Sequence, residues 1–157
     1  MGLDCWTSLL KTTMSKVEQT LSLIKPDAVE RNLEQEIKQF FIKSGFRITK
    51  QKKVKLEKKD AEIFYKVHET KPFYNDLCNY LSSGPIVAMI LEKVDAVSEN
   101  RKVMGATDPT KADEGTIRKK YGLSIDKNSV HGSDSVENAK QEIEFFFSKR
   151  EIFANKN

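Results

Sequence analysis

One of the two histidines of this 157-residue chain lies in a short polar segment just before a helix-forming stretch. His131 is followed by Gly-Ser-Asp-Ser, and residues 136–147 repeat apolar side chains at helical spacing. The backbone N–H groups and the dipole at a helix start attract anions. A neutral imidazole beside such a site can attack a phosphoryl group held there. Spacing alone leaves two interpretations open, a phosphoryl-accepting nucleophile and an ordinary surface histidine.

The helix after His131 carries further polar groups. Asp134 can cap its first turn, and Ser133 and Ser135 add hydroxyl donors. Glu142 lies at the edge of the apolar stripe, where a carboxylate can orient an imidazole ring. Because a helix rises ~1.5 Å per residue, contact between Glu142 and His131 requires the preceding loop to fold back alongside.

Three cations stand at the ends of predicted elements. Lys25 ends an apolar strand, Arg101 lies on a helix, and Arg118 follows a long loop at residues 105–116. Loops of this length in compact domains are often functional. Each cation alone has an ordinary explanation, such as an arginine stem lying along apolar surface. Together they suit phosphoryl transfer, where catalysis is mostly positioning and charge neutralisation.

The composition indicates a soluble globular protein. Charged residues make up 32% of the chain, the net charge is +4, and no apolar run approaches the ~18–20 residues of a membrane span. The two cysteines form neither a disulfide framework nor a metal motif, which favours a cytoplasmic location. The lysine-rich residues 50–59 lack interleaved aromatic side chains, so a solvated strand edge is favoured there over a nucleic-acid surface.

The elements that must position these groups can be read from hydrophobic patterns. Strands are expected at residues 20–25, 46–56, 86–91 and 121–125, with an edge or bulge near residues 50–53 in the second. Asn32 and Gln35 resemble a capping box for a helix that Gly45 closes. Strands separated by helices predict an α/β (α+β) sandwich with helices covering a small sheet.

We expect one domain at residues 20–157, because a chain of this length buries a real core. Residues 1–19 are expected to be a flexible N-terminal extension or an expression remnant. The chain contains neither G-x-x-x-x-G-K-[ST] nor G-x-G-x-x-G, and no Cys/His cluster supplies metal ligands. A divalent ion is therefore expected to arrive on substrate phosphates, as Mg²⁺ commonly does.

Six segments occur in a characteristic order between residues 20 and 152: IKPDAVER, KPFY, SGPIVAMILE, RKVMGATDP, EGTIRKKYG and NSVHGSDS. Together they resemble the nucleoside diphosphate kinase family, and NxxHGSDS with these companions is highly specific. The resemblance implies a ferredoxin-like βαββαβ fold, with a four-stranded antiparallel sheet and extra covering helices. It also implies ping-pong transfer of the γ-phosphate of a nucleoside triphosphate, mainly ATP, to nucleoside or deoxynucleoside diphosphates through phosphohistidine.

The resemblance also implies a role for each matching residue. The catalytic group is His131 as nucleophile, Glu142 as the carboxylate that orients it, Lys25, Tyr65 and Ser133. The nucleotide-binding group is Lys25, Phe73, Arg101, Thr107, Arg118 and Asn128. Phe73 is expected to stack on the base, and because every base has a π-face this would explain broad nucleotide use. No residue is expected to be a direct metal ligand, since Mg²⁺ is carried on the nucleotide.

The sequence departs from the family at residues 32–35, at Val67, where many members carry an acidic residue, and at Glu114 in place of a proline. The GATDP motif resembles that of bacterial members, in which homotetramers and homohexamers both occur. Two alternatives have other functions: a phosphohistidine relay or regulatory protein with little turnover, and a nucleic-acid-binding module. The complete set of nucleotide-site residues argues against the first, and the lack of aromatic side chains among the lysines against the second.

Overall fold

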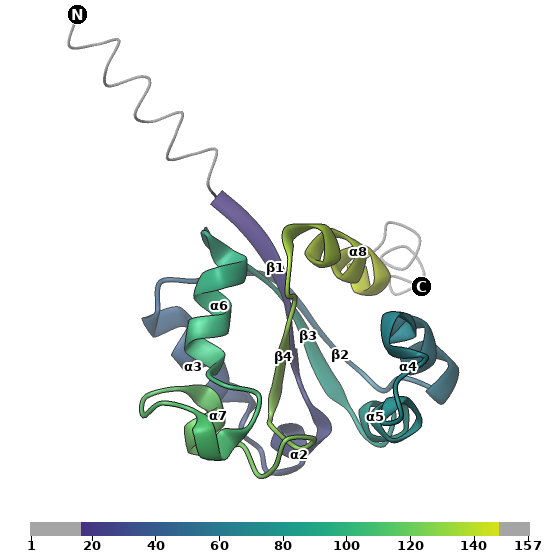
Figure 1. Ribbon diagram of the computed structural model, residues 1–157. Helices are drawn as coiled ribbons and strands as arrows, with labels where there is room; N and C mark the ends of the chain where they lie inside the picture. Colours follow the sequence, from purple (N-terminus) through teal and green to yellow (C-terminus); the bar gives the residue numbers. More distant parts are fainter. Residues whose placement is uncertain (1–16, 148–157) are drawn as a thin grey trace, which may run out of the picture.

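The computed structural model describes residues 17–147 and shows a four-stranded antiparallel sheet between two layers of helices (Figure 1). The strands are β1 (Val17–Ile24), β2 (Arg47–Val54), β3 (Ile86–Val94) and β4 (Val130–Gly132). Their order in the sheet is β2-β3-β1-β4. This is the predicted ferredoxin-like arrangement. Since β1 begins at Val17, it starts before the expected domain boundary at residue 20, and residues 1–16 of the expected extension lie outside the described residues.

The two apolar runs form the centre of the sheet, as expected. Most residues of β1 and β3 are buried, because helices cover both faces of these strands. The lysine-rich β2 lies at one edge. Its pairing with β3 shifts register between Ile48 and Lys50, which confirms the predicted irregularity.

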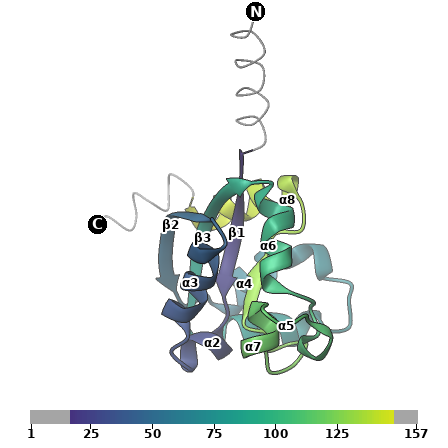
Figure 2. The ribbon, with the colours of Figure 1, turned by 90° about the vertical axis from the view of Figure 1, so that its left-hand side faces the viewer.

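Each face of the sheet is covered by its own set of helices (Figures 1 and 2). One face carries α3 (Glu34–Lys43), α6 (Ala96–Met104) and α7 (Ile117–Tyr121), with α2 (Pro26–Glu30) near one end. The other carries α4 (Lys58–Phe64), α5 (Tyr74–Leu81) and α8 (Val136–Phe147). Short 3₁₀ turns occupy Lys66–His68 and Pro109–Lys111. Within the described range, none of the helices combines the length and apolar character that a bilayer span requires.

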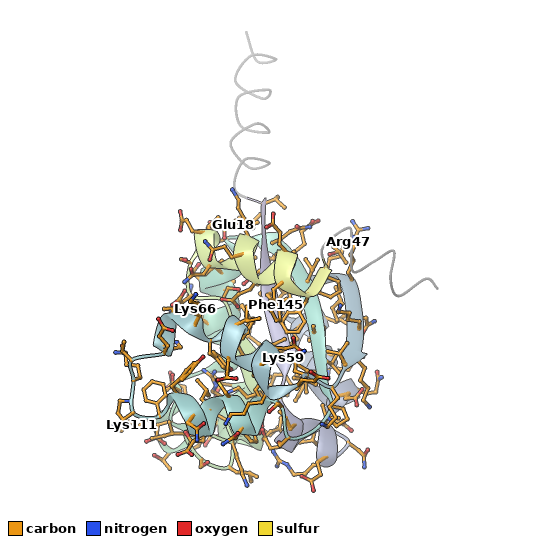
Figure 3. All side chains as sticks on the ribbon, turned by 90° about the vertical axis from the view of Figure 1, so that its right-hand side faces the viewer. Glu18, Arg47, Lys59, Lys66, Lys111 and Phe145 are labelled. Carbon is orange, nitrogen blue, oxygen red and sulfur yellow. The ribbon has the colours of Figure 1, made fainter. Side chains whose placement is uncertain are left out.

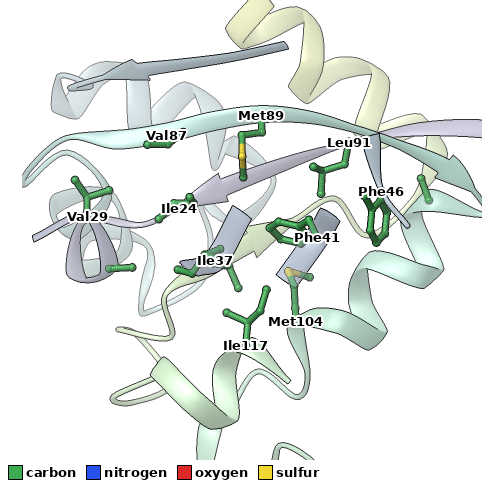
Figure 4. Packing of buried hydrophobic residues seen from close by; sticks show 13 residues of the cluster. Ile24, Val29, Ile37, Phe41, Phe46, Val87, Met89, Leu91, Met104 and Ile117 are labelled. Atoms are coloured by element: carbon green, nitrogen blue, oxygen red, sulfur yellow. The ribbon is translucent and has the colours of Figure 1, made fainter. Parts of the chain in front are cut away.

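Alternation along the strands divides the buried side chains between two cores. On the α3 and α6 side, Phe41 and Met104 pack with Leu91 of β3 (Figure 4). On the opposite side, Leu23 of β1 packs in a cluster with Phe146 of α8. Figure 3 shows this second face, with Phe145 between α8 and α4. This second core packs α8 against β1, the strand that pairs with the His131 strand.

The fourth strand is not where the sequence pattern placed it. Residues 117–121 form α7, whose start is capped by Thr116: its Oγ1 accepts a hydrogen bond of 3.3 Å from the Lys119 N–H. Leu123 and Ile125 follow in a loop and are 60% and 56% exposed. The prediction of a strand at residues 121–125 is therefore wrong, because the alternation came from a helix end followed by exposed loop side chains.

The predicted capping box is also wrong. The residue that precedes α3 is Leu33, and it makes no side-chain capping hydrogen bond. Asn32 instead adopts a left-handed conformation with φ 59°, which asparagine tolerates in turns. Gly45 does follow the end of α3 with φ 90°, so the predicted glycine stop is confirmed.

Candidate active site

His131 lies on β4 opposite Leu23 of β1, so its ring shares the face covered by α4 and α8. Its Nε2 is 2.7 Å from Oε1 of Glu142 on α8. A carboxylate only accepts hydrogen bonds, so Nε2 carries the hydrogen and the neutral ring keeps its lone pair on Nδ1. The contact between His131 and Glu142, which spacing left open, is present in the fold.

The start of α8 explains how Glu142 reaches the ring. Ser135 Oγ accepts a hydrogen bond of 3.1 Å from the Asn138 N–H and so caps the helix. Asp134 does not cap the backbone; its Oδ1 accepts from the Asn138 side-chain amide at 2.5 Å, and that prediction was wrong. Phe146 anchors the far end of α8 in the second core. The helix therefore runs back along the sheet and carries Glu142 over His131.

Ser133 and Tyr65 surround this pair in different ways. Ser133 is fully buried, and its Oγ donates to Glu142 Oε1 at 3.2 Å, so it positions the carboxylate. The Tyr65 ring lies 6.3 Å from the His131 ring, centroid to centroid, at 81°. Burial, and next the charge of Glu142, raise the pKa of Tyr65 far above its ordinary value. Tyr65 therefore stays protonated as a possible hydrogen-bond donor.

A cleft of about 880 Å³ opens in front of His131, within the usual size range of ligand sites. Eight of the ten predicted site residues line it: Lys25, Tyr65, Phe73, Arg101, Thr107, Arg118, Asn128 and His131. Glu142 and Ser133 are absent from its lining and reach the cleft only through the His131–Glu142 contact. The fold therefore brings together residues from six separate segments of the chain.

Lys25 immediately precedes α2 and is buried. Its Nζ donates to Asn128 Oδ1 at 2.9 Å, and the Asn128 amide donates to the Thr107 carbonyl at 3.1 Å. Burial, and next the charge of Arg118, lower the pKa of Lys25 to about 8. Lys25 therefore stays mostly charged at neutral pH but titrates just above it.

Arg118 lies in the cleft wall and is held there by two backbone carbonyls. Its Nη1 donates to the Gly105 carbonyl at 3.0 Å and its Nη2 to the Val130 carbonyl at 2.9 Å, whereas its buried Nε has no hydrogen-bond partner. Burial, and next the charge of Arg101, lower its pKa to about 10. Within residues 17–147, none of Lys25, Arg101 and Arg118 forms an ion pair with a carboxylate. Three cations with no acidic partner suit an anionic ligand.

The outer end of the cleft is aromatic and apolar. Phe73 is 47% exposed, and its ring lies 5.9 Å from that of His68, centroid to centroid. Ile125 lines the same cleft. His68 and Ile125 line the cleft but were not predicted as site residues, and Ile125 was expected in a strand. The one local signal for Ile125 is an apolar side chain inside the polar segment before Asn128.

Carboxylates also face the cleft. Asp113, Asp126 and Asp134 line it beside the cations. In the part of the chain that the structure describes, no group of three or more His, Cys, Asp and Glu side chains is placed to hold a metal ion. Mg²⁺ is usually bound by one or two carboxylates together with substrate phosphates, so these aspartates are suitable neighbours for an ion carried by a ligand.

Comparisons with known proteins point to one family. The sequence model described as nucleoside diphosphate kinase matches residues 18–152. The nucleoside diphosphate kinase of Persephonella marina is 55% identical over 136 residues, which cover 87% of this chain and 97% of that protein. That of Campylobacter hominis is 56% identical, with 87% and 99% covered. A crystal structure of the Aquifex aeolicus nucleoside diphosphate kinase superposes with a TM-score of 0.83 at 40% identity, covering 86% of this chain and 98% of that one.

Proposed function

Because the chain belongs to the nucleoside diphosphate kinase family, we propose that it transfers the γ-phosphate of a nucleoside triphosphate, mainly ATP, to nucleoside diphosphates through a phosphohistidine on His131. The observation that carries this proposal is the 2.7 Å contact between His131 Nε2 and Glu142 at the wall of a cleft lined by three cations. Deoxynucleoside diphosphates are included among the acceptors.

The reaction proceeds in two displacements. In the first, Nδ1 of His131 attacks the γ-phosphorus; the N–P bond forms, the bond from phosphorus to the bridging oxygen breaks, and a nucleoside diphosphate leaves. Glu142 holds the Nε2 hydrogen and stabilises the positive charge that develops on the ring. In the second, a terminal phosphate oxygen of another nucleoside diphosphate attacks the same phosphorus, and the N–P bond breaks to restore the imidazole.

The remaining residues bind the nucleotide. We assign the phosphates to Arg101, Arg118 and Thr107, because developing charge on a transferring phosphoryl group needs fixed cationic donors. The paired side chains of Lys25 and Asn128 are assigned to the ribose hydroxyl and a neighbouring phosphate oxygen.

Phe73 is assigned to stacking on the base, with Ile125 as a second apolar surface in the same cleft. Stacking is tolerant of base identity, so broad use of nucleotides is expected. The substrate is the Mg²⁺ complex of the nucleotide, in which phosphate oxygens supply most of the ion's ligands.

The chain is further proposed to act in the cytoplasm as a homotetramer or homohexamer. The one cysteine in the described range, Cys78, is buried and unpaired, which suits a reducing compartment. In the sheet that residues 17–147 form, β2 is an edge strand, and a strand at a sheet edge is a natural place for subunits to meet. Light scattering on the purified chain tests the assembly.

The nucleotide reaction is tested by incubating the protein with γ-labelled ATP. We expect one phosphate per chain, labile in acid and stable in base, and discharge of that label onto any added nucleoside diphosphate. His131→Ala should abolish labelling without changing the melting temperature, because the ring is only partly buried. Label that survives acid would instead point to a serine such as Ser135. Labelling of His131 without discharge to diphosphates would favour a phosphohistidine relay over a kinase.

A further inference from the structure

We propose that Asp27 is a positioning residue of the nucleotide cleft, acting through Lys25 and Asn128, which it does not touch. The proposal rests on the function proposed above. Asp27 does not line the cleft; it borders a separate cavity of about 190 Å³. Its effect on the reaction must therefore pass through neighbouring residues.

The Asp27 carboxylate is buried and satisfied from three directions. Oδ1 accepts a hydrogen bond from the Tyr80 hydroxyl of α5. Oδ2 accepts from Arg31 Nη2 of the next turn and from Ser129 Oγ, both at 3.1 Å. The Asp27 N–H donates to the Tyr80 hydroxyl at 3.0 Å. A buried charge is stable only when it is paired and hydrogen-bonded in this way, so the four side chains form one unit.

This unit fixes the turn that precedes the catalytic strand. Ser129 is fully buried and has φ 76°, a conformation that non-glycine residues adopt at a cost. Its hydroxyl contacts both Asp27 and Arg31, the second at 3.3 Å. Its carbonyl accepts from the Lys25 N–H at 2.8 Å. Ser129 therefore joins α2 to β4.

The two cleft residues are the immediate neighbours of these anchors. Lys25 lies two residues before Asp27, and Asn128 lies one residue before Ser129. Their side chains meet at 2.9 Å, between Nζ and Oδ1. With the backbone on both sides tied by Asp27, the Lys25–Asn128 pair is held in one geometry before nucleotide binds. Removing Asp27 frees both backbones at once.

Asp27→Asn tests the proposal, with kinetics read below the melting temperature of each variant. We expect kcat/KM to fall about 10- to 100-fold, the usual effect of removing a group that orients a ligand-contacting residue. Glu34→Gln is the matched control, since it breaks an exposed pair with Lys53, also on another element, and should leave kinetics unchanged. Ser129→Ala removes only the hydroxyl between Asp27 and the turn, so it tests the same link if Asp27→Asn does not fold.

Two further readouts separate positioning from general stability. Burial and Arg118 lower the pKa of Lys25, whereas Asp27 and Asp126 raise it. If charged Lys25 is needed for activity, kcat/KM falls as pH rises through this pKa, and Asp27→Asn should move that basic limb to lower pH. In Lys25→Ala and Asn128→Ala backgrounds, Asp27→Asn should lower kcat/KM by a smaller factor than in the wild type, because the residues act as one unit.

Three outcomes would overturn the positioning role: Asp27→Asn keeps wild-type kcat/KM, leaves the basic limb of the pH profile in place, or lowers kcat/KM in a Lys25→Ala or Asn128→Ala background as much as it does in the wild type. Failure of the proposed function looks different, because the wild-type protein itself would then form no phosphoenzyme.

Discussion

Arg101 and Arg118 carry the same charge in the same cleft, but they differ in burial, so substituting them should affect stability differently. Arg101 is exposed on α6, whereas Arg118 is buried and holds the Gly105 and Val130 carbonyls. We expect Arg101→Ala and Arg118→Ala each to lower kcat/KM about 10²–10³-fold, the loss typical of one electrostatic contact to a transition state. Steady-state kinetics with ATP and a second diphosphate measure this.

Stability should separate the same two variants. Arg118→Ala leaves two carbonyls without their donor, so the free energy of unfolding should fall by about 1–3 kcal/mol. Arg101→Ala should leave it nearly unchanged, because surface substitutions usually do. Urea unfolding provides the comparison. For the kinetic prediction above, near-wild-type kcat/KM in both variants would mean that the phosphates bind elsewhere.

Lys25 should give the reaction a basic limb. Burial and Arg118 lower its pKa to about 8, so it is charged below that pH and loses its charge above it. Because only the charged form attracts phosphate oxygens, kcat/KM should fall as pH rises through about 8. Tyr65 cannot produce this limb, since burial raises its pKa. Lys25→Met should be less active but show no such limb, and a limb retained in that variant would refute the assignment.

Gly132, next to His131 on β4, packs where no side chain fits. A Cβ at this position would lie 2.3 Å from the Asn100 side-chain nitrogen and 2.7 Å from Met104 Cε of α6. We expect Gly132→Ala to destabilise the fold by about 1–3 kcal/mol, as overpacking does, and to reduce activity by displacing β4. Gly84→Ala is the control, because a Cβ there meets only Pro26 at 3.7 Å. Thermal unfolding of both variants tests this prediction. Equal melting temperatures for Gly132→Ala and Gly84→Ala would contradict it.

The strands and helices were predictable to different degrees. β1 and β3 each contain a mainly apolar, buried run, and such a run predicts an inner strand whatever the details of packing. β4 spans only Val130–Gly132, contains a glycine, and is a strand because β1 offers it a partner. Such a strand has no periodicity of its own to detect. Local pattern therefore could not predict its position.

The site residues and their contacts were likewise predictable to different degrees. His131, Glu142 and the three cations could be singled out from residue types and spacing. The other nucleotide-binding residues followed only from the family resemblance. The contact of His131 with Glu142 was not predictable from spacing, since it depends on the direction in which α8 leaves Ser135. The burial that lowers the pKa of Lys25 likewise comes from α2 packing near β4. The surroundings of Lys25 thus depend on tertiary packing between segments about a hundred residues apart.

The cleft as a whole is assembled from segments between Lys25 and Asp134, so it exists only in the folded chain. A nucleotide that binds there therefore stabilises the native state by mass action. At an ADP concentration 100 times its dissociation constant, the free energy of unfolding should rise by ~2.7 kcal/mol. His131→Ala should keep this gain, because the imidazole attacks phosphorus and contributes little to ground-state binding. Arg118→Ala should lose much of it at the same ADP concentration. Denaturant unfolding with and without ADP measures both, and an ADP-independent midpoint in the wild-type protein would mean that the cleft does not bind nucleoside diphosphates.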